Sequence, residues 1–169
     1  MSSGRPKDAN PANPRLYLVT PAVEDPRALD AALTDAFGAA RFAALLLRLS
    51  PSDDRTQINR IKTIAPAVQK NEAALILDGH PGLVAKSGAD GAHMTGIDDF
   101  MDAVDNLKPD WIAGAGGILT RHDAMLAAEK NADYVMFGEP NERGHRQPFD
   151  DILDRVVWWA EVFQLPCVA

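Results

Sequence analysis

Short apolar runs that alternate with helical segments constrain this chain more than any other feature. The clearest unit spans residues 73–96, where an apolar run at 73–77 precedes a polar turn, a short helical segment and a second apolar run at 92–94. Runs that are apolar throughout are typical of strands buried on both faces of a parallel sheet. The unit therefore predicts strand, loop, helix and strand of an α/β fold.

The same unit recurs along the whole chain. We expect strands at 16–21, 42–49, 73–77, 92–94, 111–115 and 133–137, and the start of a seventh at 165–169. We expect helices at 26–37, 55–70, 81–87, 98–107, 121–130 and 149–163. Regular alternation of this kind predicts a parallel sheet, of which the TIM (β/α)8 barrel is the commonest closed form. A complete barrel needs at least ~200 residues, so we expect a TIM-type barrel that is incomplete after about six βα units.

Length and charge limit the classes of partner. The chain has 169 residues and a net charge of −7, which argues against a nucleic-acid groove or an anionic membrane surface. No apolar run approaches the ~18 residues of a membrane span. Residues 1–14 are polar and predict a disordered lead-in without a signal peptide, and residues 15–169 predict a single domain. These features favour a cytoplasmic protein.

Glycines, carboxylates and cations follow the predicted strands, at the sheet edge where α/β proteins usually bind ligands. The candidates at these positions are Arg48, Asp78, His80, Asp98, Gly114, Gly116, Gly117, Gly138, Glu139, Arg143 and Arg146. Glycine lets the backbone approach a ligand, and its N–H group binds anions. The three arginines are suited to a phosphate or diphosphate. The two aspartates supply the oxygen ligands that Mg²⁺ takes beside substrate phosphates, so the set predicts a phosphorylated small molecule with Mg²⁺.

Several of these residues also have a purely structural interpretation, which the sequence leaves open. Arg48 is placed to pair with a carboxylate inside the barrel, Asp98 to cap its helix, and Gly138 to end a strand. His93 lies within a predicted strand, which favours a hydrogen-bonded core histidine. His80 lies in a loop and is the better candidate for a base.

Three segments carry a resemblance to a known family: LYLVTP from Leu16, ADGAHMTG from Ala89 and ADYVMFGEP from Ala132. Together they resemble thiamine phosphate synthase and its relative, the thiazole tautomerase TenI. The resemblance implies a TIM barrel that joins hydroxymethylpyrimidine diphosphate to thiazole phosphate and releases diphosphate, with Mg²⁺. Loss of diphosphate leaves a pyrimidine carbocation, so positioning and electrostatic stabilisation would dominate catalysis.

The resemblance also implies roles for particular residues. Arg48 and Arg146 would hold diphosphate, Asp78 and Asp98 would help to place Mg²⁺, and residues 114–117 would line the pocket for the ring. The substrates would be small phosphorylated pyrimidine and thiazole compounds. Members of the family are often oligomeric, which implies a homo-oligomer.

Two other functions stay open at this point. One is a TenI-like isomerase that acts on a thiazole phosphate carboxylate, with His80 or Glu139 as the base. The other is a non-catalytic barrel that binds a phosphorylated metabolite. Leu46 and Ser50 stand where the synthases carry Gln and Lys, so the chain would be a divergent member of the family.

Overall fold

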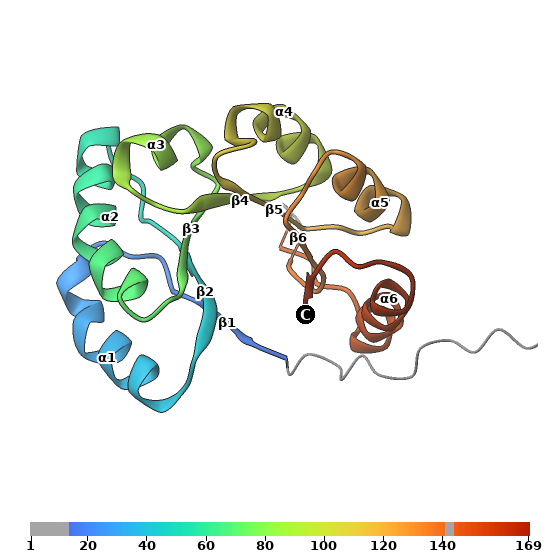
Figure 1. Cartoon of the computed structure of the whole chain (residues 1–169), viewed down its shortest axis with the longest axis horizontal. Helices are drawn as coiled ribbons and strands as arrows, with labels where there is room; N and C mark the ends of the chain where they lie inside the picture. The colour runs from blue at the N-terminus through green and yellow to red at the C-terminus, as the bar shows by residue number, and fades with distance from the viewer. Residues whose placement is uncertain (1–13, 141–143) are drawn as a thin grey trace, which may run out of the picture.

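Seven parallel strands form one curved sheet, and each is joined to the next through a helix on the outside (Figure 1). The computed structural model describes residues 14–140 and 144–169. The strands are β1 (Leu16–Val19), β2 (Phe42–Leu47), β3 (Ala74–Asp78), β4 (Gly91–Thr95), β5 (Ile112–Gly116), β6 (Tyr134–Met136) and β7 (Cys167–Val168). The spatial order equals the chain order, β1 to β7. The expected strand pattern is therefore confirmed.

The helices fall where the apolar periodicity predicts them. They are η1 (Pro26–Leu29), α1 (Asp30–Ala39), α2 (Asp54–Gln69), η2 (Pro81–Leu83), α3 (Val84–Ser87), α4 (Ile97–Leu107), α5 (Arg121–Glu129) and α6 (Phe149–Val162). None of these helices is both long and apolar enough to cross a bilayer. The side chains of Asp25, Asp53 and Thr120 accept hydrogen bonds from backbone N–H groups in the first turns of η1, α2 and α5.

Strand β2 explains why the apolar runs are continuous. Leu45 and Leu47 point outward into the core beneath the helices, whereas Ala44 and Leu46 point into the barrel with Ile76 of β3. Both sets are buried, so every residue of the strand must be apolar. The sheet curves enough to enclose the inner set. The TIM-type fold is thereby confirmed, with β1 and β7 as the two edges of the sheet.

An aromatic cluster fixes α6 against the sheet. Trp159 is fully buried, its ring stacks on Phe163 with centroids 4.1 Å apart, and its edge meets Phe137 just after β6. The indole Nε1 of Trp159 donates to the carbonyl of Leu165, 2.8 Å away. These contacts set the direction in which the chain leaves α6 and enters β7. Ile152 near the start of α6 packs beside Gly138, so the start of α6 lies next to the end of β6.

Candidate functional site

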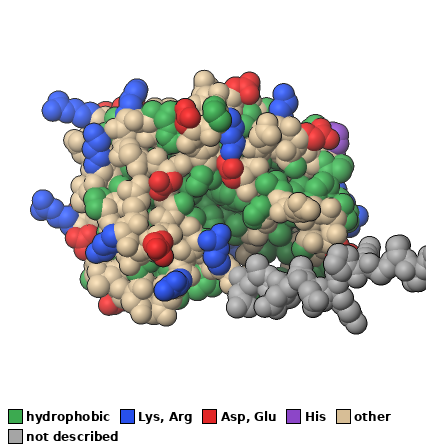
Figure 2. Space-filling view, in the orientation of Figure 1, with side chains coloured by type: hydrophobic (Ala, Val, Ile, Leu, Met, Phe, Trp, Pro, Cys, Tyr) green, Lys and Arg blue, Asp and Glu red, His purple; other side chains and the backbone are tan. Residues whose placement is uncertain are grey.

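A cavity of about 700 Å³ opens beside the carboxyl ends of the strands. Its walls are Tyr17 and Val19 of β1, Arg48 after β2, residues 136–140 at the end of β6, Arg146, Gln147, Phe149 and Ile152 at the start of α6, and the last two residues, 168 and 169. Figure 2 shows hydrophobic side chains gathered in a hollow at the centre of the molecule. A mostly apolar cavity of this size with a few charged groups is typical of a small-molecule site.

Arg48 is the best-positioned cation of the cavity. Its Nε donates to Oδ2 of Asp78 at 2.9 Å, and an Nη donates to Oε1 of Glu139 at 3.4 Å. Its backbone N–H donates to Oγ1 of Thr20. The two side-chain bonds engage two of the five N–H donors of the guanidinium, and the Arg48 side chain is 41% exposed. Arg48 therefore pairs with carboxylates, as one interpretation of the sequence held, and still presents donors to an anion.

Glu139 reaches from the loop after β6 across β5 to His93 of β4. Its Oε2 lies 2.9 Å from Nε2 of His93, which is fully buried. Glycine at position 116 makes this possible, because a Cβ there would overlap both the carboxylate and the imidazole. The Glu139 side chain is 9% exposed and belongs to the cavity wall. The Glu139 carboxylate, which is paired with His93, therefore lines the cavity.

Two tyrosines extend the same chain of hydrogen bonds through the barrel. Nδ1 of His93 lies 2.8 Å from the hydroxyl of Tyr134, which lies 2.6 Å from the hydroxyl of Tyr17. The imidazole also stacks on the Tyr134 ring, with centroids 5.6 Å apart. Gly114 gives the ring its space, since a Cβ at this position would overlap the phenol. Both nitrogens of His93 are therefore occupied, which fixes the ring.

The hydrogen bonds decide the ionisation of Glu139. Burial raises the pKa of Glu139. The hydrogen bond and charge of His93, together with Arg48 and the backbone of Gly117, lower it by more, so the pKa falls below the ordinary 4.5. Burial raises the pKa of Tyr17 and that of Tyr134 well above the ordinary value. At neutral pH Glu139 is therefore ionised and both phenols are neutral.

A stability measurement against pH tests the state of Glu139. A carboxyl group whose pKa is lower in the folded state stabilises the protein above its unfolded pKa, and this contribution is lost as the pH falls through the folded pKa. We therefore expect the free energy of unfolding to fall with acidification below about pH 4.5, and to fall less in Glu139→Gln. Urea titrations at successive pH values measure both slopes. Identical slopes for the two proteins would contradict the assignment.

The remaining predicted residues lie in different places. Arg146 and Gly138 line the cavity, and Gly138 has φ +87. Gly114 and Gly116 lie beneath the Tyr134 ring and the Glu139 carboxylate, and the cavity wall does not include them. Arg143 lies outside the described residues.

The predicted base His80 and metal ligand Asp98 lie away from the cavity wall. His80 follows β3 at the start of η2, and Asp98 is exposed in the first turn of α4. The N-terminal cap of α4 is Gly96 rather than Asp98, so the capping interpretation of Asp98 was wrong.

The arrangement of the carboxylates shows what kind of Mg²⁺ site the described residues fit. In the part of the chain that the structure describes, no three His, Cys, Asp or Glu side chains cluster to hold a metal ion. Mg²⁺ beside substrate phosphates commonly takes one or two carboxylates and several waters. Asp78 is 24% exposed and has one oxygen engaged by Arg48. Its chemistry fits an Mg²⁺ ion that arrives with the substrate phosphates, and the described residues do not build a protein cage for one.

Comparison with known proteins identifies the family. The family model described as thiamine monophosphate synthase matches residues 16–169. The chain belongs to this family. A thiamine-phosphate synthase of Rhodospirillum centenum is 36% identical over 157 residues, which cover 92% of this chain and 76% of the relative. One of Hyphomonas neptunium is 33% identical over 163 residues, covering 92% of this chain and 73% of the relative.

A solved structure supports the fold of this member of the thiamine monophosphate synthase family. Thiamine phosphate pyrophosphorylase from Pyrococcus furiosus superposes with a TM-score of 0.67 over 90% of this chain and 72% of that one. Its sequence is 21% identical, so the likeness concerns the fold alone. The resemblance to the family that the sequence motifs carry is confirmed by these comparisons.

Sequence reasoning on this family member missed the inner part of the site. Tyr17, His93 and Tyr134 did not stand among the candidates, because they lie within strands. A signal was present: Gly114 and Gly116 alternate along β5, and Gly114 is in register with His93 of β4. Two glycines on the inner face of a buried strand indicate that large side chains from its neighbours need the space.

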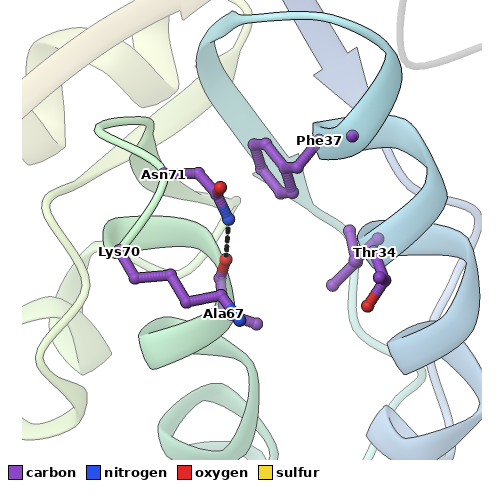
Figure 3. A pocket seen from close by; sticks show the side chains of 7 residues that line it. Thr34, Phe37, Ala67, Lys70 and Asn71 are labelled. Atoms are coloured by element: carbon purple, nitrogen blue, oxygen red, sulfur yellow. Dashed lines mark hydrogen bonds between the residues drawn. The ribbon is translucent and has the colours of Figure 1, made fainter.

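A second, smaller cavity carries few groups for chemistry. It has about 210 Å³, lies between α1 and α2, and is lined by Thr34, Phe37 and Lys70 among others (Figure 3). Asn71 donates to the carbonyl of Ala67 beside it, as Figure 3 shows. Its wall contains one cation and no carboxylate. The cavity that contains Arg48 and Glu139 is the stronger candidate for the site of this family member.

Proposed function

We propose that the chain condenses hydroxymethylpyrimidine diphosphate with thiazole phosphate and releases diphosphate, a step of thiamine biosynthesis. The observation that carries the proposal is the family match over residues 16–169, together with a cavity at the carboxyl edge of the sheet that contains Arg48. The two relatives described above are both named thiamine-phosphate synthase, and the match to this chain covers 76% and 73% of their lengths.

The charged side chains suit the bond that breaks. Loss of diphosphate places negative charge on the leaving group and positive charge on the pyrimidine methylene. Arg48 and Arg146 line the cavity and would stabilise the negative charge of the leaving diphosphate. The ionised Glu139 would stabilise the positive charge of the pyrimidine methylene. Apolar side chains such as Val19, Met136 and Ile152 form the walls for the rings. Because Asp78 and Glu139 hold Arg48 before the ligand arrives, its reorganisation on binding is small.

We place Mg²⁺ in the same proposal as a cofactor. Asp78 would share it with the substrate phosphates, whereas Asp98 lies away from the cavity wall, and the ion would neutralise charge on the departing diphosphate. Asp78 would then orient both Arg48 and the metal. The neighbouring position is Gly79, so the chain offers one carboxylate at the end of β3.

A product assay tests the proposed function. The full chain is incubated with both substrates and Mg²⁺, and thiamine phosphate and diphosphate are quantified together. We expect equal amounts of the two products and loss of both when Mg²⁺ is chelated. Lys70→Ala, which changes the cavity between α1 and α2, serves as the matched control and should leave the rate unchanged. A folded chain that forms neither product would contradict the proposal.

One observation favours a second function, the TenI-like isomerisation of a thiazole phosphate carboxylate. Glu139 is an ionised, largely buried carboxylate in the cavity wall, and this is what a general base requires. His80, the other predicted base, is absent from the cavity wall as described. Isomerisation without release of diphosphate would favour this function, and binding without either reaction would favour a non-catalytic metabolite-binding barrel.

We also propose that the chain acts in the cytoplasm as a homo-oligomer. Phe149, Leu153 and Val157 are 73%, 46% and 47% exposed and lie one turn apart along α6, which gives an apolar stripe. Leu153→Asp with Val157→Asp should shift the sedimentation coefficient to that of a monomer. Asp154→Asn on the same helix is the control and should leave it unchanged. A monomeric wild-type chain at micromolar concentration would contradict self-association.

A further inference from the structure

Arg155 lies in the middle of α6, outside the wall of the cavity that contains Arg48. Its Nη1 donates to the carbonyl of Ile118, 3.4 Å away, and to Oε1 of Gln147. Gln147 belongs to the cavity wall, and its Nε2 donates in turn to the carbonyl of Leu119 at 3.4 Å. Three hydrogen bonds therefore join α6, the segment before α6 and the loop after β5.

The loop after β5, residues 117–119, is itself anchored. The Ile118 side chain is 2% exposed and belongs to the hydrophobic core. The backbone of Gly117 bonds to the carboxylate of Glu139, which lines the cavity. Two parts of the cavity wall, Glu139 and Gln147, are therefore bonded to the same anchored loop.

The charge of Arg155 is directed at neutral acceptors. Among the described residues it makes no ion pair, although Asp151 and Asp154 lie on the same helix. Hydrogen bonds from a guanidinium are charge-assisted and stronger than those between neutral groups. The Arg155 side chain is partly buried, so these bonds are shielded from water on one side. The arrangement favours a role in holding Gln147 over a role as a surface charge.

Arg146 precedes Gln147 in the chain, and its exposed side chain lines the cavity. Ordering a mobile side chain or loop on binding lowers the affinity for the ligand. We propose that Arg155 is a positioning residue for the cavity. It holds Gln147 against the loop after β5 and so keeps the backbone at Arg146 in place before an anionic ligand binds. The inference rests on the proposed function, in which Arg146 faces the diphosphate.

Calorimetric titration of the full chain with inorganic diphosphate and Mg²⁺ tests the proposal. We expect Arg155→Met to weaken binding about 3- to 10-fold, the cost of ordering one or two mobile side chains. Arg155→Lys keeps a cationic donor and should recover part of the loss. Arg121→Met is the matched control, because Arg121 also contacts α6, 4.7 Å from the ring centroid of Trp158, and it should bind as the wild type does. Equal affinity of Arg155→Met and the wild type would overturn the proposal.

A double-mutant cycle tests whether Arg155 acts through Arg146. Residues that act through one another show non-additive effects, whereas independent residues show additive ones. We expect Arg146→Met to weaken diphosphate binding, and Arg155→Met to cause no further loss in the Arg146→Met protein. Losses that add in the double variant would overturn the positioning role.

Hydrogen exchange of the backbone amides at 144–147 provides a readout that needs no ligand. We expect exchange there to be several-fold faster in Arg155→Met than in the wild type and in Arg121→Met, because the segment before α6 loses its bonds to the loop after β5. Unchanged exchange would contradict the positioning role. A folded wild type that fails to bind diphosphate would contradict the proposed function instead, which distinguishes the two failures.

Discussion

Replacing Arg48 with methionine is expected to lower the rate of diphosphate release by about 100-fold or more, the effect of removing one well-placed donor from a developing anion. The substitution removes a cation from the cavity wall, and it leaves Asp78 and Glu139 without the cation that now joins them. The measurement is kcat/KM for diphosphate release with both substrates present.

Two further variants sharpen this test. Arg48→Lys keeps the charge but loses the planar fork that bonds two carboxylates at once, so we expect an intermediate rate. Arg55→Met removes an exposed cation from α2 and should match the wild type. A rate for Arg48→Met within about threefold of the wild type would show that diphosphate binds elsewhere.

Replacing Gly114 with alanine is expected to lower the free energy of unfolding by about 1–3 kcal/mol, the usual cost of overpacking a core. The added Cβ would overlap the Tyr134 ring, which is buried and hydrogen-bonded to both Tyr17 and His93, so relieving the overlap would disturb these bonds. Urea denaturation measures the change, and the hydrogen-bonded chain to Glu139 should be disturbed with it.

Gly82→Ala is the matched control for this substitution. Gly82 has open space around its Cβ position and no unusual backbone angle, so alanine there should leave stability unchanged or raise it slightly. If Gly114→Ala were as stable as the wild type, the close packing of Tyr134 over β5 would be wrong.

The fold was predictable because it depends on local periodicity. Apolar runs and helical stripes alternate along the chain, and β2, α4 and α5 lie within one or two residues of the expected ranges. The Phe42–Leu47 run is apolar throughout because the barrel buries both of its faces. Such a pattern needs no knowledge of distant contacts.

The site was predictable only in part, because it depends on contacts between distant residues. Arg48, Asp78 and Glu139 stood among the candidates since each follows a strand. These three residues form one network, and Glu139 pairs with His93, only because the Glu139 side chain passes over Gly116 of β5. A loop position favours His80 over His93, because His93 lies within β4 and contacts Glu139 only once the sheet has curved around it.

Calorimetric titration of the full chain with a non-hydrolysable pyrimidine diphosphate tests most directly whether this cavity binds the substrate through Arg48. It is performed with and without Mg²⁺, on the wild type and on Arg48→Ala. We predict binding by the wild type that weakens without Mg²⁺ and is lost in Arg48→Ala while the fold is retained. Undiminished binding by folded Arg48→Ala, or no binding by the folded wild type with Mg²⁺, would contradict the assignment of the site.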